Sequence, residues 1–170
     1  MTGTQRLGAA DSWFLYLEGP TQHLHVTGLM LLDPATSPDA VTFEKFYGHV
    51  EARLDHLPMF RKRLVEVPLG IDHPAIVDDP ELDLAGHVIH ESFAGRSEHE
   101  FRAFLDDFSS EPLDRSKPLW EMVFATDLPD GRCALLAKLH HTMIDGITGV
   151  GIMADLLDLE ADAPADKGTP

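Results

Sequence analysis

Two segments of the chain carry apolar residues at a spacing of three or four, which is typical of helices that bury one face. The first occupies residues 42–58, ends at Pro58, and presents Phe43, Phe46, Val50, Leu54 and Leu57. The second begins with Ser97 and Glu100, whose spacing fits a capping box, and continues with Phe101, Phe104, Leu105 and Phe108. The pattern therefore predicts two amphipathic helices.

Other apolar runs lack helical spacing and are rich in residues that favour strands. Residues 23–32 predict a buried strand. Residues 119–127 and 132–140 flank a turn-forming segment at 129–131 that contains proline and glycine, and they predict a β-hairpin. Between residues 60 and 93 the pattern indicates shorter extended pieces that are separated by proline and glycine.

Shorter helices are predicted near both ends of the chain. Residues 11–19, with the sequence DSWFLYLEG, predict one helix with Asp11 or Ser12 as the N-cap. Another helix is predicted from about Ile147, with Asp145 in the N-cap position. The mixed order of helices and strands favours an α+β fold, in which a mixed sheet packs against helices.

The chain has 170 residues, which is enough for one domain with a substantial core. We assign that domain to residues 1–160. Residues 161–170 form a polar stretch that contains proline and glycine and has no core positions, so they are interpreted as a linker or tail.

The charge balance is strongly acidic, because 13 Lys and Arg stand against 29 Asp and Glu, for a formal net charge of −16. A surface of this sign repels phosphate backbones, which argues against nucleic acid as a partner. Cys133 is the single cysteine, and the N-terminus has no signal-peptide pattern. No apolar run approaches the ~20 residues that cross a bilayer. These observations predict a cytoplasmic protein whose contact with a membrane or lipid is peripheral.

The stretch KLHHTMIDG combines two adjacent histidines, His140 and His141, with Asp145 and Gly146. It lies where the predicted hairpin ends and the next helix begins. Three interpretations are open: polar groups that are merely satisfied at a strand end, metal ligands, or a single general base. Metal binding is the weakest, since adjacent residues on a strand point to opposite faces, whereas zinc-binding helices space two histidines four apart. A general base must be held in one tautomer and orientation.

HHTMIDG fits the pattern HHxxxDG of the CoA-dependent acyltransferase superfamily, which includes chloramphenicol acetyltransferase and condensation domains. Upstream, Pro118, Leu119 and Trp120 match the PLW motif of bacterial wax ester synthases/diacylglycerol acyltransferases. The segments that begin ADSWFLYLEG and LGIDHPAIVDD also resemble that family in order and spacing. The resemblance covers residues 7–160. Within the family, the chain resembles the N-terminal domain of an enzyme of the actinobacterial triacylglycerol synthase type.

The resemblance implies one lobe of a two-lobed enzyme with the chloramphenicol-acetyltransferase-like fold, and it implies a role for each motif residue. His141 would be the general base, and His140 its motif neighbour. Asp145 would brace the loop, and Gly146 would allow the chain to turn. The resemblance assigns no metal site.

The implied substrates are acyl-CoA, as a co-substrate rather than a cofactor, and diacylglycerol or a long-chain alcohol. Pro118, Leu119 and Trp120 are interpreted as a wall near the acyl channel or, equally, as ordinary core. The resemblance also implies that the C-terminal lobe is missing, so the 170 residues alone are expected to be nearly inactive. The alternatives are a non-catalytic lobe that binds lipid or a partner, and an acyltransferase for another alcohol.

Other isolated features are interpreted as structural. The remaining histidines share no ligand spacing and are interpreted as surface or satisfied groups: His23, His25, His49, His56, His73, His87, His90 and His99. The basic cluster at residues 60–63 is interpreted as a solvated edge rather than a contact for CoA phosphate or a lipid headgroup. Cys133 is predicted to lie on a buried strand, away from any base.

Overall fold

The structure is a computed structural model that describes residues 4–143 and residue 156. Within the described residues, a four-stranded sheet forms the centre of the fold, in the order β2 (His25–Leu32), β7 (Cys133–His140), β6 (Trp120–Thr126) and β5 (Val88–Ser92). β2–β7 and β6–β7 are antiparallel pairs, whereas β5 runs parallel to β6. The sheet is therefore mixed, as the sequence predicted.

The predicted hairpin is confirmed, with strand ends within one residue of the expected positions. Its strands are β6 and β7, which pair from Trp120 opposite Leu139 to Ala125 opposite Ala134. Gly131 in the connecting turn has a φ of 81°, a left-handed conformation that glycine adopts without a steric penalty. The hairpin ends at His140, so the first histidine of the motif lies at the C-terminal end of an inner strand of the sheet.

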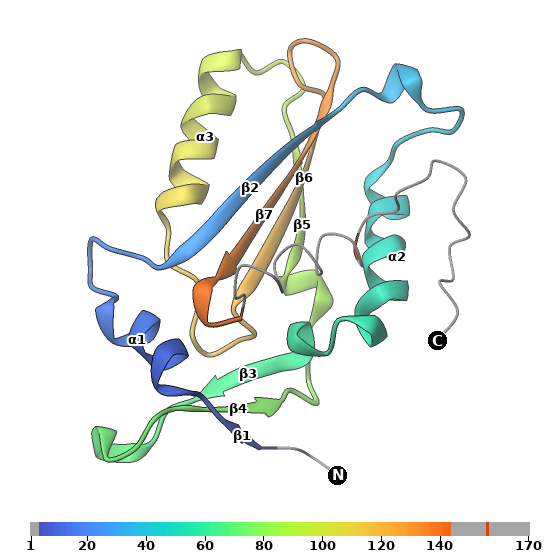
Figure 1. Ribbon diagram of the computed structural model, residues 1–170. Coiled ribbons are helices and arrows are strands. Elements are labelled where there is room, and N and C mark those ends of the chain that lie inside the picture. Colours follow the sequence, from blue (N-terminus) through green and yellow to red (C-terminus); the bar gives the residue numbers. More distant parts are fainter. Residues whose placement is uncertain (1–3, 144–155, 157–170) are drawn as a thin grey trace.

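Each face of the central sheet packs against a different helix, because side chains alternate along β6 and β7. On one face, Phe46 of α2 (Phe43–Arg53) stacks on Phe124 of β6 with ring centroids 5.1 Å apart. On the other face, Phe101 and Phe108 of α3 (Glu98–Ser110) pack in one cluster with Val123 and other small or branched residues of the hairpin. Figure 1 shows the sheet between these two helices.

Both amphipathic helices are confirmed, and both have the side-chain caps that stabilise their first turns. The capping box of α3 is complete: the Ser97 hydroxyl accepts the Glu100 N–H, and the Glu100 carboxylate accepts the Ser97 N–H. Thr42 caps α2 by accepting the Lys45 N–H. These are local signals, which explains why the sequence alone located both helices.

The predicted strand at residues 23–32 is present, but the prediction was wrong about its first residue and about its burial. The strand begins at His25, and it lies at an edge of the sheet in the part of the chain that the structure describes. Val26, Leu29 and Leu31 are 42%, 45% and 43% exposed. An apolar run can mark either a central strand or an edge strand, and only the pairing distinguishes them.

A second, smaller sheet packs below the first and comprises β1 (Gln5–Arg6), β4 (Ala75–Asp78) and β3 (Lys62–Val65), in that order, among the residues described. β3, β4 and β5 are the extended pieces that the sequence indicated between residues 60 and 93. β4 lies in the middle and pairs antiparallel with β1 and with β3.

Helix α1 (Ala9–Leu17) begins earlier than predicted, with Gly8 at the N-cap position and no side-chain cap. Asp11 and Ser12 therefore lie inside the helix, and Ser12 is completely buried. The predicted capping role of these residues was wrong because residues 9 and 10 continue the helix toward the N-terminus.

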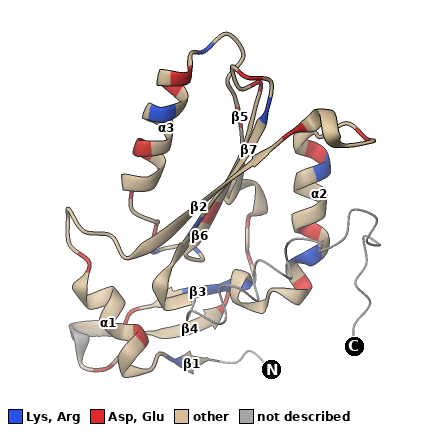
Figure 2. Ribbon diagram, turned by 45° about the horizontal axis from the view of Figure 1, so that its top comes forward, with Lys and Arg blue, Asp and Glu red and all other residues tan. Residues whose placement is uncertain are grey.

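Charged residues gather on the helices and loops, whereas most of the central sheet is uncharged (Figure 2). Lys138 of β7 is an exception, because it carries a charge within the central sheet. Its side chain is buried, and only 1% of the residue is exposed. Its ammonium group donates to the carbonyl oxygens of Phe108 and Glu111 at the C-terminal end of α3, at 2.7 and 3.1 Å. A cation is stabilised there by the helix dipole and by carbonyls that lack partners within the helix.

Two predictions near the C-terminus lie outside the described residues: the helix from about Ile147, with its Asp145 cap, and the tail at 161–170. In the part of the chain that is described, no helix has the length and apolar character needed to cross a membrane.

Candidate functional site

The two histidines of the motif occupy the point where β7 ends and a short 3₁₀ turn, His141–Met143, begins. Neighbouring segments hold their backbone on both sides. The His140 N–H donates to the Leu119 carbonyl at 3.0 Å, and the His141 N–H donates to the Leu24 carbonyl at 2.9 Å. The backbone of the motif is thus fixed by the segments that precede β6 and β2.

His140 is buried, with 1% of its surface exposed. Its Nδ1 atom accepts the Thr142 N–H at 3.1 Å, so in the neutral ring the proton is on Nε2. That Nε2 atom lies 3.2 Å from Glu18 Oε1, a close polar contact whose geometry falls short of a hydrogen bond. Burial lowers the pKa of His140 below its usual value, although the Glu18 charge opposes this. His140 is therefore a neutral, oriented imidazole.

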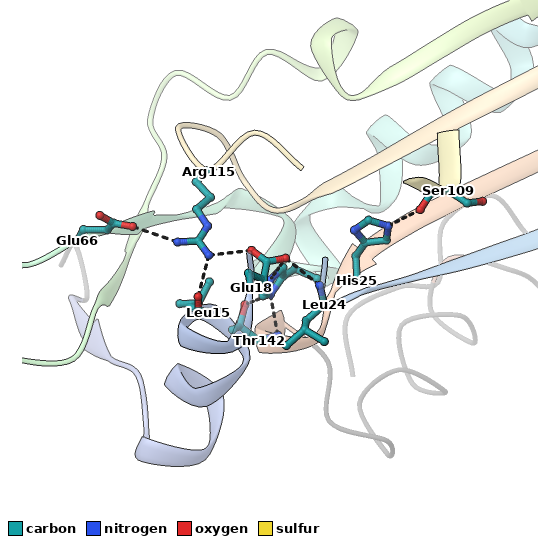
Figure 3. A network of polar contacts seen from close by, with 9 residues as sticks. Leu15, Glu18, Leu24, His25, Glu66, Ser109, Arg115 and Thr142 are labelled. Atoms are coloured by element: carbon teal, nitrogen blue, oxygen red, sulfur yellow. Dashed lines mark hydrogen bonds and ion pairs between the residues drawn. The ribbon is translucent and has the colours of Figure 1, made fainter. Parts of the chain in front are cut away.

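Glu18 is the centre of a polar network that joins four segments of the chain (Figure 3). Its carboxylate accepts the Leu24 N–H at 2.8 Å and pairs with the Arg115 guanidinium at 2.7 Å. Arg115 also donates to the Leu15 carbonyl at 2.9 Å and lies 3.3 Å from Glu66. Burial alone would raise the pKa of Glu18, but the contacts with Arg115 and Leu24 outweigh it, so that the pKa is lowered and the carboxylate is charged.

His141 differs from its neighbour in being only partly buried. Its ring stacks on Phe14 of α1, with centroids 5.1 Å apart and an angle of 17° between the ring planes. Neither of its ring nitrogens makes a polar contact with the described residues. Such an imidazole is held in place by its face while its nitrogens stay available, so it can exchange a proton with a bound molecule.

Of the other predicted site residues, Pro118, Leu119 and Trp120 are all buried. The Trp120 ring lies against Phe60 on one side and His87 on the other, with both centroid distances 4.5 Å, and its Nε1–H donates to the Phe60 carbonyl at 2.9 Å. The PLW segment is part of the core in the described structure, and it reaches the motif through the Leu119 carbonyl. Asp145 and Gly146 lie outside the described residues.

The sequence analysis missed Glu18, Arg115 and Phe14 as site residues. Glu18 and Arg115 are 97 residues apart in the chain, and each stands alone among ordinary residues. No spacing or motif signals such a pair, because their contact forms only where the C-terminal end of α1 meets the loop between α3 and β6.

Two of the remaining histidines make structural contacts, and the cysteine is buried. His87 is buried and donates from Nδ1 to the Trp120 carbonyl, and His25 contacts the Ser109 carbonyl through Nε2. Burial raises the pKa of the Cys133 thiol, which disfavours the reactive thiolate. In the predicted basic cluster, Phe60 is fully buried and belongs to the core. Among the residues described, no group of three or more His, Cys, Asp or Glu could hold a metal ion.

The free energy of unfolding is expected to fall as the pH drops below about 6.5, the ordinary pKa of histidine. Burial lowers the pKa of His140 and of His87 in the folded protein, so the unfolded chain binds protons that the folded chain does not. The contribution of the two neutral histidines to the free energy of unfolding is fully present above about pH 6.5. It is lost as the pH falls toward their lowered pKa values, by up to about 1.4 kcal/mol per pH unit for each group. Urea unfolding at a series of pH values measures the effect.

The matched variants for this experiment are His87→Gln with His140→Gln, and His99→Gln as the control. In the double variant His87→Gln/His140→Gln, the free energy of unfolding should depend less steeply on pH. The His99→Gln control, at an exposed position on α3, should leave this dependence unchanged. An equally steep dependence in the His87→Gln/His140→Gln protein would contradict the prediction.

The architecture is that of one lobe of the acyltransferase fold, as solved structures show. The wax ester synthase/diacylglycerol acyltransferase from Marinobacter aquaeolei VT8 matches with a TM-score of 0.70 and 30% identity, over 88% of this chain and 36% of that one. The first condensation domain of the calcium-dependent antibiotic synthetase matches with a TM-score of 0.67 over 91% of this chain and 37% of that one; at 18% identity it supports the fold alone. The predicted α+β fold class is confirmed.

Residues 7–170 match the wax ester synthase/diacylglycerol acyltransferase catalytic domain, and the chain belongs to this family. A diacylglycerol O-acyltransferase homologue from Mycobacterium tuberculosis (strain ATCC 25618 / H37Rv), Rv3087, is 37% identical over 94% of this chain and 34% of its own length. The tgs3 homologue from the same strain is 31% identical over 94% of this chain and 59% of its own length. The chain spans about a third of the length of Rv3087 and of the Marinobacter enzyme.

Proposed function

We propose that this chain is the N-terminal lobe of an acyl-CoA-dependent O-acyltransferase that esterifies diacylglycerol or a long-chain alcohol. The observation that carries the proposal is the contrast between the two histidines. His140 is buried and engaged, whereas His141 is partly exposed, stacked on Phe14, and has both ring nitrogens available in the described structure. Membership of the family and the names of the homologues support the reaction class.

In the proposed reaction, His141 accepts the proton of the alcohol hydroxyl while the alcohol oxygen attacks the thioester carbonyl of acyl-CoA. A carbon–oxygen bond forms, the carbon–sulfur bond breaks, and the proton passes from His141 to the departing thiolate of CoA. A general base of this kind contributes about 10²–10⁴-fold to the rate. The alignment of the two substrates contributes a further, larger factor.

The proposal assigns supporting roles to the other motif residues. Asp145 braces the loop that follows His141, and Gly146 allows it to turn. Pro118, Leu119 and Trp120 form the packed floor behind His140 and, through it, one side of an acyl channel. A fatty acyl chain would gain about 0.8 kcal/mol for each methylene that it buries in such a channel.

A second lobe completes the proposed enzyme. Rv3087 and the Marinobacter enzyme are about three times as long as this chain, and a net charge of −16 is unfavourable for polyanionic CoA. We therefore place most of the contact with CoA on the second lobe. The contact of the enzyme with a lipid surface is peripheral in this proposal.

The proposal is tested by assaying acyl transfer from palmitoyl-CoA to dioleoylglycerol and to hexadecanol. The protein to assay is this chain joined to, or expressed together with, the C-terminal lobe of the Marinobacter enzyme. We expect ester formation by the two-lobed protein and almost none by the 170-residue chain. Rapid turnover by the 170 residues alone would refute the need for a second lobe. If the folded two-lobed protein forms no ester with either acceptor, the activity itself is refuted.

A further inference from the structure

We propose that Glu18, held in place by Arg115, is a positioning residue that orients both histidines of the motif. The catalytic consequence of this inference rests on the proposed function of His141, whereas its structural basis does not. Three separate chains of contacts lead from the Glu18 carboxylate to the two imidazoles.

The first connection is direct. Glu18 Oε1 lies 3.2 Å from His140 Nε2, while the Thr142 N–H donates to the Nδ1 atom on the opposite side of the ring. One side of the imidazole therefore faces a donor and the other faces an anion. This arrangement favours the tautomer with the proton on Nε2, and it fixes the rotation of the His140 ring. The 3₁₀ turn that follows is then anchored by its own second residue, Thr142.

The second connection passes through the backbone. The same carboxylate oxygen accepts the Leu24 N–H at 2.8 Å, and the Leu24 carbonyl accepts the His141 N–H at 2.9 Å. Leu24 immediately precedes β2, and its two backbone groups connect Glu18 with His141. Glu18 therefore positions the main chain of His141 indirectly, through Leu24.

The third connection sets the ring of His141. Arg115 donates one N–H to the Leu15 carbonyl in the last turn of α1 and another to Glu18 Oε2, at 2.9 and 2.7 Å. This guanidinium group therefore holds the end of α1 against the Glu18 segment. Phe14 lies in that same turn and stacks on the His141 ring. A shift of α1 would move the aromatic surface that supports the His141 imidazole.

The buried carboxylate of this network has an opposite charge beside it. The Glu18 side chain is 13% exposed, and it is the only carboxylate in contact with His140 among the described residues. Its charge is stabilised by Arg115, which is itself less buried and reaches Glu66 at the surface. Without Glu18, the partly buried Leu24 N–H would lose its acceptor, and the buried His140 Nε2–H would lose the anion that lies 3.2 Å away. The turn would then rearrange to satisfy them.

The structural part is tested by NMR of the 170-residue chain, in which the ¹⁵N chemical shifts of the imidazoles report tautomer and protonation. We expect His140 to be neutral with its proton on Nε2. Glu18→Gln should reduce the population of that tautomer, lower the pKa of His140 further because an attractive charge is lost, and shift the His141 ring signals. Arg115→Gln should produce weaker changes in the His140 tautomer and in the His141 signals. It should raise the pKa of His140 rather than lower it, because the Arg115 charge lowers that pKa.

Glu66→Gln is the matched control, because it removes an exposed partner of Arg115 without touching Glu18 or either histidine. It should leave the His140 tautomer and the His141 signals unchanged. If Glu18→Gln also leaves both unchanged in a folded protein, the inference is wrong. If Glu18→Gln does not fold, Arg115→Gln takes its place, because it removes the guanidinium Nη2 that donates to both Leu15 and Glu18. An unchanged His140 tautomer in that variant would overturn the inference as well.

The catalytic part is tested in the two-lobed protein described above. Glu18→Gln is expected to lower kcat by up to about 100-fold, the loss that follows from misplacing a reacting group, with little change in KM. The double variant Glu18→Gln/Arg115→Gln should lose no more than Glu18→Gln alone, since both act through one network. A fully additive loss, or a change in KM alone, would contradict the positioning role. If the parent two-lobed protein has no activity while the NMR changes occur, the proposed function fails and the structural inference stands.

Discussion

Replacing His141 by alanine is expected to reduce kcat for acyl transfer by about 10²–10⁴-fold in the two-lobed protein, because the alcohol would lose its proton acceptor. The fold should be retained, since the His141 side chain is only partly buried and its ring has no polar contact with the described residues. The measurement is the initial rate with palmitoyl-CoA and dioleoylglycerol, together with thermal unfolding to confirm that the variant is folded.

Two matched variants make this experiment specific to His141. His99→Ala removes an exposed histidine from α3, far along the chain from the motif, and it should leave kcat unchanged. His140→Ala should lower stability as well as activity, because it removes a ring that is 1% exposed and leaves Glu18 without its neighbour. If His141→Ala retained more than about a tenth of the parent rate, a general base worth at least about 10²-fold could not be located at this residue.

The largest loss of stability is expected for Trp120→Ala, at about 3–5 kcal/mol in the free energy of unfolding. The Trp120 ring is 1% exposed and lies between Phe60 and His87, so its removal leaves a cavity in the core. The variant also leaves the Phe60 carbonyl without the indole donor that lies 2.9 Å away. Urea unfolding of the 170-residue chain measures the difference.

The other tryptophan provides the control for this prediction. Trp13 lies on α1 and is 60% exposed, so Trp13→Ala should change the free energy of unfolding by no more than about 0.5 kcal/mol. If Trp120→Ala cost as little as Trp13→Ala, the ring would not be part of a packed core. The interpretation of Trp120 as a channel wall would then be favoured over its interpretation as core.

Where local signals were strong, the sequence was sufficient to predict the elements. The capping box of Ser97 and Glu100, the apolar spacing in α2 and α3, and the turn at Gly131 all act over a few residues, and the structure confirms each. The predictions that were wrong concern burial and helix starts. Val26, Leu29 and Leu31 were predicted to be buried, yet β2 lies at an edge of the described sheet, which depends on partners distant in the chain.

The candidate site shows the same division. The HHxxxDG pattern located His140 and His141, because a motif is a local feature of the chain. The pattern could not indicate Glu18, which contacts His140, or Arg115, which contacts Glu18, because only the tertiary fold brings these residues together. A close approach between residues more than 90 positions apart leaves no local periodicity or spacing from which it could be inferred.

By itself, then, the sequence determined that a hairpin would end at two adjacent histidines, that only one of them could face a given pocket, and that the charge would be strongly acidic. Only the tertiary structure decided which histidine is buried. His140 is enclosed because the end of β7 lies beneath α1 and beside Glu18, whereas His141 begins a turn and keeps its nitrogens available in the described part of the chain. The physical reason is that alternation along a strand is a local property, while the elements that cover each face are brought there by long-range packing.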